Sequence, residues 1–112
     1  MNGNDIVIVS ATRTAIGKFG GQFATTSAIE LGTAVAKSAI QKAKLSPDQI
    51  DTVIFGNVLQ AGLGQNPARQ VGLKAGLLHS STALTVNEVC GSGLKAIILA
   101  AQSLRLGDAK IV

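Results

Sequence analysis

Cys90 is the only cysteine in this chain and the side chain best suited to covalent chemistry. It stands between an apolar run, residues 83–89, and a helical pattern that begins at Gly91. The first turn of a helix has backbone N–H groups without intrahelical partners and a partial positive charge, so it favours thiolate over thiol. This position therefore predicts a nucleophilic or redox-active thiol.

The surroundings of Cys90 also fit a purely structural role. A free cysteine is often only a small buried apolar residue, and small neighbours often serve close packing. Glycine inside a helix costs about 1 kcal/mol relative to alanine. Gly91 and Gly93 therefore mark either the approach of a substrate or tight packing, and the pattern alone leaves both interpretations open.

The elements that must position Cys90 follow an alternating order. Strand-like runs cover residues 5–10, 52–59, 83–89 and 110–112, and helical periodicity covers residues 27–44, 68–76 and 91–106. This alternation predicts an α/β fold with a mostly parallel sheet flanked by helices. The run 5–10 is continuously apolar and β-branched, so we expect it to be a central strand. Because the sequence ends inside a strand-like run, we interpret residues 1–112 as an incomplete domain.

Several local signals fix the expected element boundaries. Ser27 and Glu30 have the spacing of a capping box, which starts a helix. Pro47 follows Ser46 and predicts a short helical turn before the next strand. Gly56 lies within a strand-like run and predicts a close backbone approach. Gly107 follows the last apolar position of the final helix and predicts a left-handed cap.

Composition excludes several classes of function. The net charge is +4, but the basic residues are scattered, and Trp and Tyr are absent, so we expect no nucleic-acid partner. His79 has no second histidine or cysteine at ligand spacing, so we expect no metal site. We see no signal-peptide pattern and expect no membrane-spanning segment. A single cysteine forms no internal disulfide, which fits the cytoplasm.

Three stretches resemble the motifs of the thiolase family. They are residues 86–97 around Cys90, residues 11–21 and residues 56–70. The resemblance implies an acyltransferase in which Cys90 becomes acylated by acetyl-CoA and passes the acetyl group to a second acetyl-CoA, giving acetoacetyl-CoA, or runs the reverse thiolysis. It implies coenzyme A thioesters as substrates, no tightly bound cofactor, and a homo-oligomer. It also implies that the chain is the amino-terminal part of a thiolase-like domain.

The same resemblance assigns roles to other residues. The backbone N–H of Cys90 would help to form an oxyanion hole, with Gly91, Ser92 and Gly93 as supporting positions. The segments 13–17 and 65–70 would be structural and subunit-contact loops. Glu88 departs from the family, which more often has a basic or amide residue there. The resemblance identifies no coenzyme A-binding residue in this chain.

Thiolases also use a histidine that activates the nucleophile and a second cysteine as acid and base, both in a carboxyl-terminal half. We therefore expect residues 1–112 to be inactive alone. Two alternatives stay open. One is another condensing enzyme of the same superfamily, and the other is a non-catalytic truncated product or a redox-sensitive thiol protein.

Overall fold

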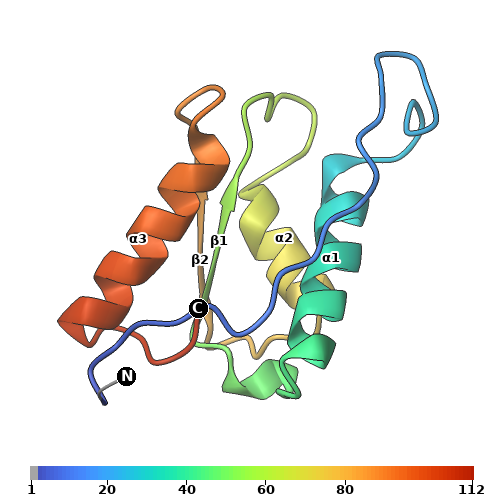
Figure 1. Ribbon diagram of the computed structural model, residues 1–112. Helices are drawn as coiled ribbons and strands as arrows, with labels where there is room; N and C mark the ends of the chain where they lie inside the picture. The colour runs from blue at the N-terminus through green and yellow to red at the C-terminus, as the bar shows by residue number, and fades with distance from the viewer. Residues whose placement is uncertain (1–2) are drawn as a thin grey trace.

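A computed structural model describes residues 3–112 of the chain. Its elements, in chain order, are α1 (Ala28–Lys42), the short 3₁₀ helix η1 (Pro47–Gln49), β1 (Thr52–Gly56), α2 (Pro67–Lys74), β2 (Thr82–Val86) and α3 (Ser92–Leu106). Helix α3 lies on one side of the strands, and α1 and α2 lie on the other (Figure 1). The predicted α/β class with helices flanking a parallel sheet is confirmed.

The sheet of the described residues consists of β1 and β2, which pair in parallel from Thr52–Thr82 to Gly56–Val86. Helix α2 connects the two strands, as a parallel pair requires. Buried apolar side chains of α2 and the turn after it, including Val71 and Leu77, form part of a small core. Because the strands are parallel, their carboxyl ends lie at the same edge of the sheet, and the segment after β2 leads to Cys90.

Local capping explains where the helices begin and end. The Ser27 hydroxyl accepts a hydrogen bond from the Glu30 N–H, and the Glu30 carboxylate accepts one from the Ser27 N–H. This pair is the predicted capping box, and it begins α1. The predicted turn at Pro47 and the left-handed cap at Gly107, with φ of 80°, are confirmed as well.

The amino-terminal run 5–10 is not a strand, so our prediction of a central strand there is wrong for this structure. Val7, Ile8 and Val9 are 50%, 77% and 64% exposed. The Ser10 hydroxyl donates to the Ala39 carbonyl of α1, 2.7 Å away. This bond ties the end of the run to α1 instead of to the edge of β1. A strand needs a paired neighbour, and apolar composition does not supply one.

The predicted strand at residues 110–112 is not formed either. A side-chain anchor fixes this segment beside the start of β1. The Asp51 carboxylate accepts hydrogen bonds from the N–H groups of Lys110 and Ile111, at 2.7 and 3.1 Å. The Asp51 N–H donates to the Ile111 carbonyl at 3.0 Å. These bonds lower the pKa of Asp51, first through the Lys110 N–H and then through the Ile111 N–H.

Our expectation that no segment could span a membrane needs correction on length and composition. Residues 89–106 form an 18-residue window with a mean hydropathy of 1.2. Helix α3 itself has 15 residues, and at 1.5 Å per residue it is about 22 Å long, shorter than a typical bilayer core of about 30 Å. The window is therefore weak evidence for a membrane span.

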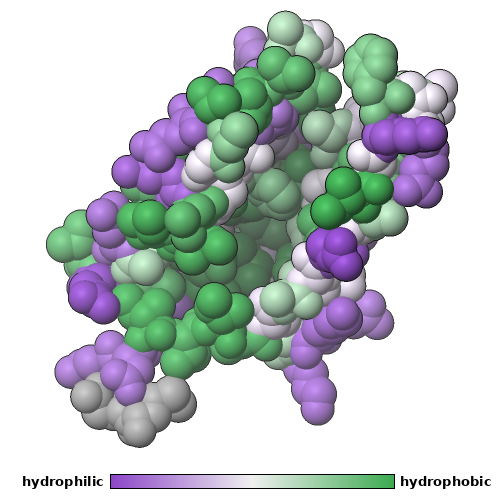
Figure 2. All heavy atoms as spheres, turned by 45° about the horizontal axis from the view of Figure 1, so that its top comes forward, coloured by the Kyte–Doolittle hydropathy of each residue, from purple (hydrophilic) through white to green (hydrophobic). Residues whose placement is uncertain are grey.

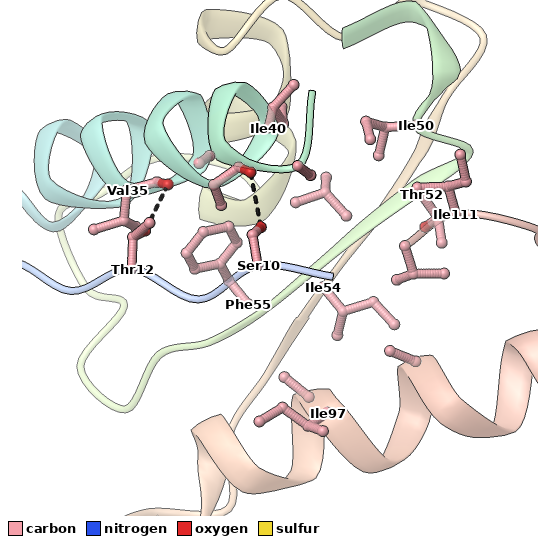
Figure 3. A pocket seen from close by; sticks show the side chains of 18 of the residues that line it. Ser10, Thr12, Val35, Ile40, Ile50, Thr52, Ile54, Phe55, Ile97 and Ile111 are labelled. Carbon is pink, nitrogen blue, oxygen red and sulfur yellow. Dashed lines mark hydrogen bonds between the residues drawn. The ribbon is translucent and has the colours of Figure 1, made fainter. Parts of the chain in front are cut away.

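An open apolar groove lies between α1 and α3, along the edge of β1 that faces away from β2. Its volume is about 600 Å³. In Figure 2 hydrophobic side chains surround this hollow. Figure 3 shows Ile54 and Phe55 of β1 with Ile97 of α3 around it, and Ser10 and Thr12 bonded to α1. Within residues 3–112, the edge of β1 that faces away from β2 pairs with no strand and borders this groove.

Candidate active site

Cys90 lies in the short turn between β2 and α3, and it is exposed. Gly91 is the N-cap of α3, so the helix begins at Ser92, one residue later than predicted. The thiol therefore comes just before the first helical turn, at the carboxyl end of the parallel strands. In α/β sheets this edge is the usual place for ligand binding.

The residue before Cys90 has an unusual backbone conformation. Val89 has φ of 50°, in the left-handed region. For a β-branched residue this conformation is strained and costs on the order of 1–3 kcal/mol. Such strain persists only where the surrounding structure holds it, and it tends to occur at functional sites. Neighbouring groups must therefore hold the turn that presents Cys90.

Ser92 holds this turn from the helix side. Its buried hydroxyl donates to the Val89 carbonyl at 2.6 Å and accepts from the Glu88 N–H at 2.9 Å. The backbone adds further bonds from Gly91 N–H to the Glu88 carbonyl and from Ser92 N–H to the Val89 carbonyl. Ser92, expected to be a supporting position, therefore contacts both residues that precede Cys90.

Asn87 holds the same turn from the strand side. Its Oδ1 accepts from the Val89 N–H at 2.8 Å, and its Nδ2 donates to the Val58 carbonyl at 3.1 Å. Asn87 lies within the thiolase-like stretch 86–97, but we had assigned it no role. A signal for one was its amide side chain three positions before the cysteine, because asparagine often bonds to nearby backbone in turns.

Gly56 at the end of β1 lets α3 approach the sheet. A β-carbon on Gly56 would lie 2.4 Å from the carbonyl carbon of Ser92 and 2.5 Å from the Gly93 nitrogen. Any side chain at residue 56 would push the first turn of α3 away. The close approach predicted from this glycine is confirmed, although Gly56 ends the strand instead of lying within it.

Two charged side chains lie beside the thiol-bearing turn. Lys95 Nζ lies 3.6 Å from Glu88 Oε1, and both side chains are partly exposed. A pair this exposed is expected to contribute little to stability. Among residues 3–112, no group of three His, Cys, Asp or Glu side chains is arranged to hold a metal ion.

His79 lies at the opposite end of β2 from Cys90. It precedes the strand, which covers Thr82–Val86, whereas Cys90 follows it. Five residues of strand span about 16 Å at 3.3 Å per residue. A general base must lie within hydrogen-bond reach of the group it deprotonates. His79 is therefore badly placed to activate Cys90.

Residues 13–17 and 65–70, which were also singled out in the sequence, make hydrogen bonds outside the Cys90 turn. Residues 65–70 lead into α2, where the Gln70 amide donates to the Leu63 and Gln65 carbonyls at 2.7 and 2.8 Å. Asn66 caps this helix through the Arg69 N–H. Residues 13–17 lie in the exposed segment before α1. These contacts fit the structural role expected for the loops.

Comparison with known proteins places this geometry in context. The family model for the thiolase N-terminal domain matches residues 6–112. An acetyl-CoA acetyltransferase of Escherichia coli is 59% identical over 106 residues, which are 95% of this chain and 27% of that protein. An acetyl-CoA acetyltransferase of Allochromatium vinosum is 60% identical over 112 residues, which are 100% of this chain and 28% of that protein.

A solved structure agrees with these sequence matches. The crystal structure of Acat5 thiolase from Ascaris suum in complex with coenzyme A superposes with a TM-score of 0.88 at 45% identity. The match covers 89% of this chain and 26% of that one. The chain therefore spans between a quarter and a third of the length of these similar proteins.

Proposed function

This chain belongs to the thiolase family through its N-terminal domain, and from that premise we propose that it supplies the nucleophile of an acetyl-CoA acetyltransferase. Cys90 is the proposed nucleophile. The observation that carries the proposal is the exposed thiol on a strained turn, held by hydrogen bonds at the carboxyl end of two parallel strands. We infer acetyl-CoA as the substrate because the similar proteins are named acetyl-CoA acetyltransferases.

The proposed first step is a thioester exchange. The Cys90 thiolate attacks the carbonyl carbon of acetyl-CoA, a tetrahedral oxyanion forms, and the coenzyme A thiolate leaves. The acetyl group is then joined to Cys90 Sγ by a new thioester. We propose that the Cys90 N–H donates to the oxyanion, because a backbone donor beside a helix start can be aimed at the developing charge.

The proposed second step transfers the acetyl group. The enolate carbon of a second acetyl-CoA attacks the acyl-Cys90 carbonyl, which releases the thiolate and forms acetoacetyl-CoA. The reverse reaction is thiolysis. Both directions need proton transfer, and His79 lies at the wrong end of β2 for this role. We therefore propose that other parts of a full-length protein supply the acid and base, and that residues 1–112 alone are inactive.

The proposal also covers the domain, the oligomeric state and the cellular location of the protein. We propose that residues 1–112 are part of a larger thiolase-like domain in a homo-oligomer, which would cover exposed apolar side chains such as Ile8, Leu94 and Leu106. A related mouse protein is named a cytosolic acetyl-CoA acetyltransferase, at 52% identity. It supports a cytoplasmic location.

Substitution of Cys90 in the full-length protein tests this function. Cys90→Ala should abolish both acetoacetyl-CoA synthesis and thiolysis while the circular dichroism spectrum stays unchanged. The matched control is Ser103→Ala, which removes a similar small polar group from the distal part of α3. Normal turnover by the Cys90→Ala protein would refute the proposal. Activity with acyl carrier protein thioesters but none with coenzyme A thioesters would favour another condensing enzyme.

A further inference from the structure

The side chain of Asn87 links the turn that presents Cys90 to the loop after β1. The Asn87 amide uses both of its ends: Oδ1 accepts from the Val89 N–H, and Nδ2 donates to the Val58 carbonyl. Val58 belongs to the loop after β1, whereas Val89 immediately precedes Cys90. Asn87 therefore connects the thiol-bearing turn to the neighbouring strand's loop.

Packing does not hold the left-handed conformation of Val89. Val89 is 62% exposed, so few apolar contacts oppose a return to an ordinary backbone conformation. The hydrogen bonds to its N–H and its carbonyl must supply the restraint, and they come from Asn87 and Ser92. Ser92 is itself part of α3, so it fixes the turn only relative to the helix.

We propose that Asn87 is a positioning residue for the acylation of Cys90. It fixes the left-handed Val89 turn against the loop after β1, so that the thiol keeps one direction relative to the sheet edge. This inference rests on the proposed role of Cys90 as nucleophile. Asn87 does not react itself, and it acts through the backbone of Val89.

Loss of this restraint should slow acylation without weakening substrate binding. Reacting atoms must be held in near-attack geometry, and a displacement of about 1 Å can cost on the order of 100-fold in rate. Asn87→Leu keeps a similar side-chain shape and removes both hydrogen bonds. In the full-length protein we expect single-turnover acylation by acetyl-CoA to slow about 10- to 100-fold. The acetyl-CoA concentration that gives the half-maximal single-turnover rate should change by less than about twofold.

A second variant tests the bond from Asn87 to the Val58 carbonyl. Asn87→Asp retains an oxygen that can accept from the Val89 N–H but loses the Nδ2 donor to the Val58 carbonyl, so acylation should stay at least about fivefold slower than in the wild type. If Asn87→Leu does not fold, as judged by circular dichroism, Asn87→Ala replaces it in the comparison. Acylation at the wild-type rate in Asn87→Asp would overturn the proposal, because the bond to the Val58 carbonyl would then not matter.

The control separates positioning from general destabilisation. Ser27→Ala removes the cap of α1, distant in sequence from Cys90, and should lower the melting temperature while acylation stays at the wild-type rate. Acylation at the wild-type rate in Asn87→Leu would also overturn the proposal. Failure of the wild-type protein to acylate at Cys90 would instead refute the proposed function, so the two failures are distinguishable.

Discussion

Gly56 and Ser92 come so close that a β-carbon on Gly56 would lie 2.4 Å from the Ser92 carbonyl carbon. Their contact joins the end of β1 to the first turn of α3. The same serine bonds to Glu88 and Val89 through its hydroxyl. The position of the Cys90 turn therefore depends on the absence of a side chain at residue 56.

Gly56→Ala should destabilise the protein, because the new methyl group would overlap the α3 backbone. Overpacking of this kind typically costs about 1–3 kcal/mol. Gly93→Ala is the matched control, since a β-carbon there meets nothing within 4 Å. It should leave the free energy of unfolding unchanged or raise it by up to about 1 kcal/mol. Urea denaturation of both variants checks this, and equal stabilities would contradict the close approach.

Val89→Gly should relieve the strain of the left-handed backbone, because glycine adopts positive φ without a β-carbon clash. We expect the free energy of unfolding to stay the same or to rise by up to about 1 kcal/mol, despite the added flexibility of the unfolded chain. The control is Val86→Gly at the end of β2, where glycine should destabilise. A loss at residue 89 as large as that at residue 86 would show that Val89 is not strained.

The helices could be predicted more fully than the strands, for a physical reason. Helix ends depend on local residues. The Ser27 hydroxyl caps α1, and Gly107 takes the αL conformation that ends α3, and both residue types can be recognised in the sequence. A strand also needs a partner at its edge. The runs 5–10 and 110–112 have strand composition, but hydrogen bonds to Ala39 and Asp51 hold them elsewhere.

The position of the candidate nucleophile could be predicted from the sequence, but the contacts that hold it could not. The position of Cys90 between strand and helix follows from the local pattern and is confirmed. Its nucleophilic role stays a prediction. The strain at Val89 and the bridge from Asn87 to Val58 could not be predicted, because they depend on how two separate loops meet in space.

The capping box of α1 should weaken in acid. The hydrogen bond from the Ser27 N–H lowers the pKa of Glu30 below its usual 4.5. A lowered folded pKa means that the stabilisation is present above about pH 4.5 and is lost as the pH falls through the folded pKa. Glu30→Gln does not titrate, so the difference in melting temperature between wild type and variant should shrink below about pH 4. A constant difference would contradict this linkage.

The Asp51 anchor should loosen at low pH as well. Hydrogen bonds from Lys110 and Ile111 lower the pKa of Asp51 below 3.8, so its contribution is lost only as the pH falls through that lower value. Asp51→Ala should speed hydrogen exchange at the Lys110 and Ile111 amides at neutral pH. Exchange at the Ala96 amide in α3 is the internal reference. Unchanged protection at residues 110 and 111 would contradict the anchor.

The most direct test of the central claim is the chemical identity of the acylated residue. The full-length protein is incubated with acetyl-CoA alone, quenched in acid and digested, and the peptides are analysed by mass spectrometry. We predict one acetyl group on the peptide that contains Cys90, removed by hydroxylamine as expected for a thioester and absent from Cys90→Ala. An acetyl group on Ser92 or Lys95 instead of Cys90 would contradict the assignment of Cys90 as the nucleophile.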